Sequence, residues 1–222
     1  MSKASLLQPK QIIRVLRSCK AMQHGQAKAC AIALSHAALR VTEIALLDVK
    51  TVLLPSGAIR EEVHLPSRIC KNYKARTIWL SNPTARKVIQ DWVDYRLFKQ
   101  WGTTSDSSKY QGLNPSSKFV LNNRGRGYSL QPKTRRLDAG KLKTYWCCDA
   151  LEQAIRLVYR RCGLSQCSSH SGRKSLVTNS VISGVSLEQM ARILGHSDSC
   201  TTIHYVVIQQ TRIREMNELD WL

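Results

Sequence analysis

The sequence predicts an α+β fold that is mainly helical and carries one small antiparallel β-sheet. Several stretches place apolar residues three and four positions apart, which is the spacing of an amphipathic helix. Residues 49–80 differ, because β-branched runs are broken there by Pro-Ser-Gly and by a Lys-Asn-Tyr-Lys turn, as in an antiparallel sheet. With 222 residues, 43% of them hydrophobic, the chain suits a single domain, residues 1–222, with its own core.

The elements can be placed in order along the chain. We expect helices over residues 9–20, 26–47, from 82 onward and over 145–162, the sheet over 49–80, a polar loop over 102–117, a short strand over 119–122, and a run of short helices over 171–222. Gly195 is predicted to end one of these short helices, because Leu187, Met190 and Leu194 form an apolar stripe just before it.

The charge of the chain is strongly positive. Lys and Arg number 34 against 15 Asp and Glu, which gives a formal net charge of +19. Such an imbalance in a folded domain usually reflects a polyanionic partner, most often nucleic acid, although a merely basic soluble protein is the alternative. No stretch approaches the length of a membrane-spanning helix, and the first residues lack the pattern of a signal peptide, so we expect a cytoplasmic protein associated with DNA and not with a membrane.

The positive charge is densest after the predicted strand at 119–122. A Gly-containing loop is expected there, with a single acid, Asp138, in its later part. We predict that its cations contact DNA phosphates, the alternative being a solvated surface. The cations are Arg124, Arg126, Lys133, Arg135, Arg136, Lys141 and Lys143.

The eight cysteines do not indicate a disulfide framework or a metal site. No Cys-x-x-Cys pair occurs, and no export signal points to an oxidising compartment. Cys162, Cys167 and His170 could be imagined as three metal ligands, but their spacing is unlike that of known zinc sites, so buried thiols are the favoured interpretation. No motif implies a bound nucleotide or any other cofactor.

Polar residues that packing does not explain occur at five places. They are Arg40 within HAALRVTEIALL, Lys71 at the tip of the predicted hairpin, His170 with Arg173 three positions on, His196 after Gly195, and Tyr205 nine positions after His196. Each has an ordinary structural explanation when taken alone. Arg40, for example, could simply form an ion pair with Glu43.

In combination these residues resemble the catalytic domain of the tyrosine recombinases, the phage integrase family. The order and spacing of A-L-R-x-x-E-I, K-x-x-K-x-R-x-I-x-L, H-x-x-R, L-G-H-S and the final Tyr are similar to the family's over about residues 10–210. The resemblance implies that Arg40 and Arg173 are the catalytic arginines and Tyr205 the nucleophile. Lys71 would be the hairpin lysine, with Lys74 as the alternative, and His170 and His196 the active-site histidines.

These residue types suit cleavage of a DNA phosphodiester without a metal. Tyr205 could form a covalent 3′-phosphotyrosine, and because a phenol is mostly protonated at neutral pH, cationic neighbours are needed to favour the phenolate. The two arginines offer planar donor forks for the non-bridging oxygens of the phosphate. Lys71 is the candidate general acid for the leaving 5′ oxygen, and His170 and His196 could donate to the phosphate or relay a proton.

Two departures from the family pattern stand out. The block HSGRKSLVTN lacks the usual Leu before the Arg and the His-Thr after it, which puts helix packing in question rather than chemistry. Family members also commonly carry an N-terminal DNA-clamping domain. Only 39 residues precede Arg40, so we expect no such domain and a layout similar to that of the single-domain fimbrial-switch invertases.

Function and assembly are expected to follow the family. We predict a site-specific recombinase that acts on double-stranded DNA as a homotetramer, with another recombinase or a DNA-bending protein as a further partner. The alternatives are a non-catalytic DNA-binding relative that stimulates another recombinase and a type IB topoisomerase. Residues 206–222 are interpreted as a tail that docks on a neighbouring subunit or folds back on its own domain. Ile213, Met216, Leu219 and Trp221 would form its apolar face.

Overall fold

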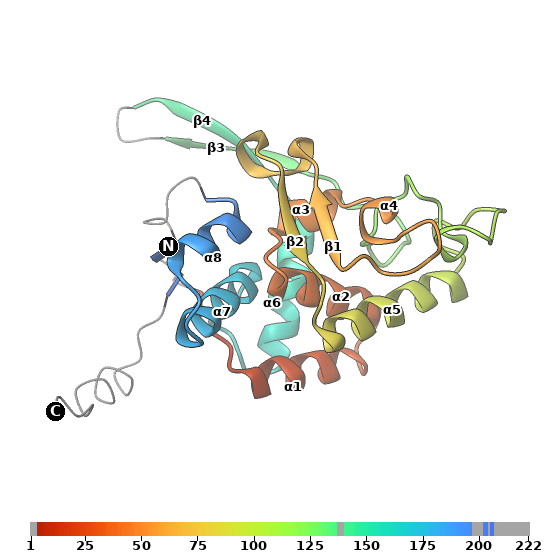
Figure 1. Ribbon diagram of the computed structural model, residues 1–222, viewed down its shortest axis with the longest axis horizontal. Coiled ribbons are helices and arrows are strands. Elements are labelled where there is room, and N and C mark those ends of the chain that lie inside the picture. The colour runs from red at the N-terminus through yellow and green to blue at the C-terminus, as the bar shows by residue number, and fades with distance from the viewer. Residues whose placement is uncertain (1–3, 137–139, 197–201, 204, 207–222) are drawn as a thin grey trace.

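A computed structural model of the chain describes residues 4–136, 140–196, 202–203 and 205–206. The fold in these ranges is mainly helical with two small antiparallel sheets, so the predicted α+β class is confirmed (Figure 1). The helices are α1 (Pro9–Cys19), α2 (Gly25–His36), α3 (Val41–Leu46), α4 (Val49–Val52), α5 (Pro83–Phe98), α6 (Asp149–Arg161), α7 (Ser169–Ile182) and α8 (Leu187–Leu194). The strands are β1 (Glu62–Leu65), β2 (Arg76–Trp79), β3 (Gln131–Arg136) and β4 (Leu142–Cys147).

Helix α2 lies at the centre of the core. Its sequence, GQAKACAIALSH, is rich in small residues, and Cys30, Ile32 and Leu34 have no exposed surface. Small side chains let neighbouring helices approach closely, and α1, α5, α6 and α7 all pack against α2. Gly172 of α7 makes one of these close approaches, since a Cβ atom there would lie 2.3 Å from Ser35 Oγ.

The predicted helix over residues 26–47 is wrong in one respect, because it is broken into α2 and α3. Ala38 adopts a left-handed backbone conformation with φ of 73°, and Arg40 is extended and forms the N-cap of α3. The Glu43 side chain accepts a hydrogen bond of 2.7 Å from the backbone N–H of Arg40, which caps the new helix. Arg40 therefore lies at a helix start and not inside a helix.

The predicted sheet over residues 49–80 is confirmed only in its second half. Residues 49–52 are helical, and the strands β1 and β2 pair in antiparallel register from Glu62↔Trp79 to Leu65↔Arg76. Their connection, residues 66–75, contains two short 3₁₀ turns, Ser67–Ile69 and Lys71–Tyr73. Lys71 is thus carried by the hairpin connection, as expected.

A second sheet was not predicted. Strands β3 and β4 form a hairpin that extends from the helical body (Figure 1), where a basic loop and the start of a helix were expected. All six pairs of the hairpin are exposed or only half-buried, so the apolar alternation that usually indicates a strand is missing from the sequence. The expected strand at 119–122 is reduced to isolated bridges such as Leu121↔Gly127.

Candidate active site

The side chains of Arg40 and Arg173 converge on one backbone oxygen. Nη2 of Arg40 and Nη2 of Arg173 donate to the carbonyl of Leu194 at 3.2 and 3.1 Å. Nη1 of Arg173 also donates to the carbonyl of Ala38, in the break between α2 and α3. Two residues 133 positions apart in sequence thus bring their guanidinium groups together at the last residue of α8.

Arg173 is fully buried and only partly satisfied. It has no exposed surface, and among the described residues its Nε finds no hydrogen-bond partner. Burial, and then the charge of Arg40, lower the pKa of Arg173 to about 10, so the group stays cationic at neutral pH. A buried cation with an unused N–H is suited to bind an anion, because such a donor is costly to leave unpaired.

A buried ion-pair network fixes the position of Arg40. Glu43, which has no exposed surface, accepts from Nη1 of Arg40 at 2.9 Å and from Nη1 and Nη2 of Arg76 at 2.6 and 2.7 Å. Burial alone would raise the pKa of Glu43, but the hydrogen bonds and charge of Arg76 and Arg40 lower it below its ordinary value. The structural and functional explanations of Arg40 are therefore compatible, since its Nη1 pairs with Glu43 while its Nη2 donates to the Leu194 carbonyl that Arg173 also contacts.

Arg76 is the residue that sequence reasoning passed over. Besides Glu43, it contacts the carbonyls of Ala38 at 2.9 Å and of Ile193 at 3.1 Å, so it ties β2 to α8 and to the break after α2. The available signal was the motif K-x-x-K-x-R-x-I-x-L, which contains Arg76 but served only to place the hairpin lysine.

Gly195 places His196 beside the two arginines. The backbone of Gly195 has φ of 65°, and a Cβ atom there would lie 2.7 Å from Cδ of Arg76, so glycine is needed both for the turn and for the contact. Gly195 ends α8 as predicted. Burial and then the charges of Arg173 and Arg40 lower the pKa of His196 to about 4, so its ring is neutral at neutral pH. Nδ1 of His196 lies 2.9 Å from Oγ1 of Thr202.

Tyr205 lies over Arg173 and beside His196. The Cζ atom of Arg173 is 5.9 Å from the centroid of the Tyr205 ring, and the ring centroids of His196 and Tyr205 are 5.3 Å apart. The hydroxyl of Thr178, on α7, donates to the backbone carbonyl of Tyr205 at 2.9 Å. The permanent positive charge of Arg173 thus lies next to the phenol ring of Tyr205.

His170 and Lys71 lie at the edge of this cluster. His170 precedes Arg173 by one turn of α7 and keeps contact with solvent. Loss of surrounding water lowers its pKa, and Arg173 and Arg40 lower it further, whereas Glu152 acts in the opposite sense. Lys71 is solvent-exposed, and partial desolvation followed by the charge of Arg40 lowers its pKa. The charges of Arg40 and Arg173 thus act on Lys71, and the choice between Lys71 and Lys74 as the lysine of the site stays a prediction.

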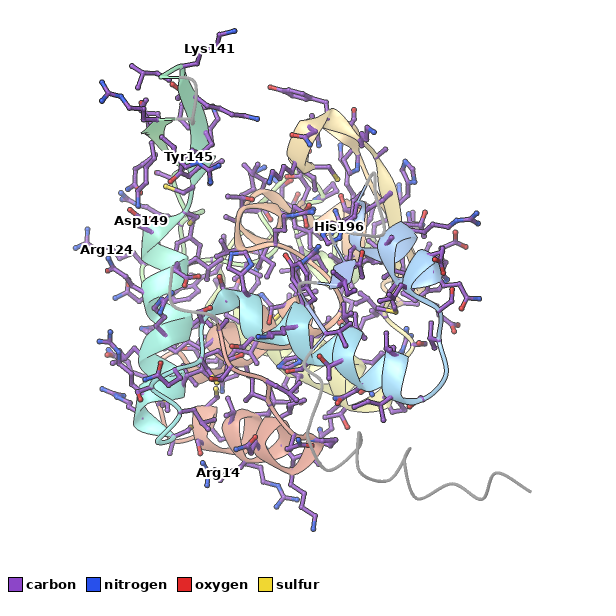
Figure 2. The ribbon with its side chains drawn as sticks, turned by 90° about the vertical axis from the view of Figure 1, so that its left-hand side faces the viewer. Arg14, Arg124, Lys141, Tyr145, Asp149 and His196 are labelled. Atoms are coloured by element: carbon purple, nitrogen blue, oxygen red, sulfur yellow. The ribbon has the colours of Figure 1, made fainter. Side chains whose placement is uncertain are left out.

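The predicted DNA-contacting cations occupy two separate surfaces. Arg124 and Arg126 are exposed on a tight turn, where Oδ1 of Asn122 accepts from their backbone N–H groups at 2.8 and 3.2 Å. The exposed cations on or next to the β3–β4 hairpin are Lys133, Arg135, Arg136, Lys141 and Lys143. Figure 2 shows Lys141 and Tyr145 on the hairpin, which projects from the body of the molecule at the upper left of the view.

Other classes of site find little support in the described part of the chain. No group of three or more His, Cys, Asp or Glu side chains is arranged there to hold a metal ion, and Cys162, Cys167 and His170 do not form one. None of the helices in these ranges combines the length and apolarity that crossing a bilayer requires.

Comparison with known proteins identifies the family. The family model described as "Phage integrase family" matches residues 5–212, so the chain belongs to the phage integrase family, the tyrosine recombinases. No curated protein is significantly similar to the chain in sequence.

Solved recombinase structures share the fold. XerA recombinase superposes with a TM-score of 0.68 at 14% identity, and 100% of this chain covers 66% of XerA. XerH site-specific recombinase, bound to a palindromic difH substrate in a post-cleavage complex, superposes with a TM-score of 0.66 at 15% identity. The match covers 96% of this chain and 52% of XerH. The Tn1549 transposon integrase in complex with transposon right-end DNA superposes with a TM-score of 0.60 at 16% identity. The match covers 97% of this chain and 66% of the solved integrase chain. The chain therefore spans between about half and two thirds of the length of these recombinases.

Proposed function

We propose that the protein cuts and rejoins double-stranded DNA at specific sites through a 3′-phosphotyrosine intermediate, as a tyrosine recombinase. The observation that carries the proposal is the convergence of Arg40 and Arg173 on the carbonyl of Leu194, with Tyr205 over Arg173. Paired arginines and a phenol at one point favour DNA cleavage over non-catalytic DNA binding, and a type IB topoisomerase, which would use the same groups, differs in lacking site preference. Its substrate, DNA, accounts for the net charge of +19.

The residues divide the chemistry among them. A phosphate at the arginine pair would accept hydrogen bonds from Arg40 and, once the groups that cover the buried Arg173 move aside, from its Nε, which would stabilise the charge of the pentacoordinate phosphate. The phenolate of Tyr205 attacks phosphorus and forms the bond to the 3′ phosphate while the bond to the 5′ oxygen breaks. Lys71 donates a proton to that oxygen, and His170 and His196 hydrogen-bond the phosphate. Rejoining reverses these steps.

The assembly that performs strand exchange would be a homotetramer on DNA, held together by residues 206–222. Residues 207–222 lie outside the described part of the chain. An apolar groove of about 450 Å³ between α1, α2, α7 and α8 supports this role, because it could accept the apolar face of a neighbour's tail. Its apolar lining includes Ile12, Ile13, Leu16, Leu176, Met190 and Ile193.

The proposed activity can be tested by trapping the covalent intermediate. Duplexes from a nicked genomic library would be incubated with the protein, denatured, and the DNA that stays attached sequenced. We expect adducts at one sequence class, joined through Tyr205. Tyr205→Phe removes one oxygen and little volume, so it should bind DNA but form no adduct. Adducts spread over all sequences would indicate a topoisomerase, and absence of adducts from the wild-type chain would indicate a non-catalytic DNA-binding protein.

A further inference from the structure

The β3–β4 hairpin has two chemically different faces. Residues paired directly across an antiparallel ladder lie on the same face, and neighbours along a strand alternate between faces. The register therefore places Arg135↔Lys143 and Lys133↔Tyr145 on one face. The other face carries Arg136↔Leu142 and Pro132↔Trp146, together with a Thr-Thr pair. We call the first the cationic face and the second the apolar face.

Both faces are accessible. Tyr145 is 45% exposed on the cationic face, and Leu142 and Trp146 are 70% and 60% exposed on the apolar face. A two-stranded ribbon with both faces in water gains little from its own packing, which suggests that it is built for contact with another molecule.

The charge on the cationic face is largely free. Nζ of Lys133 forms an ion pair of 2.7 Å with Asp149 at the base of the hairpin. Arg135 and Lys143 form no ion pair within the part of the chain that the structure describes. This face therefore offers two unneutralised cations on adjacent strands, with an aromatic ring next to them.

The hairpin lies close enough to the candidate active site for its charges to act there. The positive charges of Lys143 and Arg135 act on Lys71, where they add to desolvation and to Arg40 in lowering its pKa. Both members of this cross-strand pair are among the charges that act on Lys71. Strand β4 also contacts α3, the helix that Arg40 caps. Figure 2 shows the hairpin projecting from the body of the molecule at the upper left of the view.

We propose that the β3–β4 hairpin is a DNA-binding arm that contacts DNA only through its cationic face. Arg135 and Lys143 bind phosphates of the DNA backbone beside the scissile phosphate. This inference rests on the proposed function and narrows it, because it assigns DNA contact to one side of the hairpin and excludes Arg136. Each strand has six residues, so the arm extends for about 20 Å at roughly 3.4 Å per residue. That length corresponds to about six base pairs of duplex.

Arg135 and Arg136 provide a matched pair for the test. They are adjacent on β3, of the same type and both exposed, but they lie on opposite faces. Binding of the full chain to a 30-base-pair duplex would be measured by fluorescence anisotropy over a range of salt concentrations for Arg135→Gln, Arg136→Gln, Lys143→Gln and the double variant at 135 and 143. Thermal unfolding would be followed in parallel.

We expect Arg135→Gln and Lys143→Gln each to reduce the slope of log K against log salt by about 0.9, and the double variant to reduce it by about 1.8. Arg136→Gln should leave the slope unchanged, and all variants should unfold as the wild type does. Equal losses for Arg135→Gln and Arg136→Gln would overturn the inference, since the arm would then be a diffuse cationic surface. Unchanged slopes for all variants would also overturn it and leave the hairpin as a protein-contact element.

These outcomes are independent of catalysis. Suppose that the wild-type chain forms no covalent adduct, but the salt slope falls for Arg135→Gln and Lys143→Gln and not for Arg136→Gln. The proposed function is then wrong, and the inference about the arm is supported. If adducts form and the slopes do not separate, only the arm is wrong.

Discussion

At the residue scale, Lys71 and the arginine pair differ in environment. Their substitutions should therefore impair DNA cleavage in different ways. Arg173 is fully buried and its Nε has no partner in the described part of the chain, whereas Lys71 lies in an exposed hairpin connection near the positive charges of Arg40 and Arg173. The first arrangement suits stabilisation of phosphate charge and the second suits proton donation, because a lysine with a lowered pKa gives up its proton more readily.

A substrate with a better leaving group should therefore restore the cleavage activity that is lost when Lys71 is replaced. Lys71→Ala should slow cleavage of an ordinary duplex, since the 5′ oxygen would depart unprotonated, and a bridging 5′-phosphorothiolate should restore much of the rate. Arg173→Ala should lose about 10²–10³-fold in rate on both substrates, by analogy with removal of one donor from an oxyanion site. Lys74→Ala is the matched control and should cleave normally. Lys71 would not be the general acid if the phosphorothiolate substrate restored cleavage by Arg173→Ala. The same would follow if Lys74→Ala cleaved the ordinary duplex slowly and the phosphorothiolate substrate restored its rate.

Two neutral histidines predict how stability depends on pH. Burial lowers the pKa of His36 to about 4, and His196 also has a pKa of about 4, against an ordinary value of about 6.5. Between these values the unfolded chain binds more protons than the folded chain, so stability present above pH 6.5 is lost as the pH falls toward 4.

His36→Leu should weaken the dependence of stability on pH, because it removes a ring whose Nε2 is buried without a partner among the described residues. The measurement is the urea midpoint at a series of pH values between 7 and 4. An unchanged pH dependence in His36→Leu would mean that the ring is already hydrated or protonated in the folded chain.

At the element scale, α7 carries His170 and Arg173 into the site only because it packs very closely on α2. Ala at a helical position is normally more stable than Gly by about 1 kcal/mol. At Gly172, however, a Cβ atom would lie 2.3 Å from Ser35 Oγ and 2.7 Å from the Ser35 carbonyl carbon, which is backbone and cannot turn aside.

We therefore expect Gly172→Ala to destabilise the protein by about 1–3 kcal/mol, the usual cost of overpacking, and to reduce DNA cleavage by moving Arg173. Urea unfolding measures the first effect and adduct formation the second. Asn179→Ala, on the same helix but only half-buried, should change neither by much. A stabilised Gly172→Ala would show that α7 and α2 can separate at little cost.

The same elements show what the sequence could and could not predict. The end of α8 was predictable, because an apolar stripe followed by glycine is a local signal. The break before Arg40 was not, because HAALRV contains neither glycine nor proline and the left-handed Ala38 is held by distant partners. Its carbonyl accepts from Arg76 and Arg173, which are far away in the sequence. The β3–β4 hairpin was missed for another reason, since a ribbon exposed on both faces carries no alternation of apolar and polar residues.

At the scale of the whole molecule, the site depends on segments distributed over the chain. The carbonyl that receives both arginines belongs to α8, the arginines belong to the α2–α3 break and to α7, and Lys71 comes from the first hairpin. The order of these motifs in the sequence was sufficient to select the candidate residues, because each lies in a block with the family's spacing. Their mutual distances were not, because they depend on how α2, α7 and the hairpin pack.

The last prediction concerns assembly. If a neighbour's tail occupies the apolar groove, deleting residues 212–222 and blocking the groove should produce the same defect. Ile13 lines the groove and is 45% exposed, so Ile13→Glu should place a charge in the groove at little cost to folding. Both variants should bind a single DNA site with wild-type salt dependence but form no stable multimer when two sites are offered, as measured by sedimentation and native gels. A third variant, Ile203→Glu, changes an exposed apolar residue outside the groove and should assemble normally. If the truncated protein is unfolded while Ile13→Glu still assembles, the tail packs on its own domain and the groove has another use.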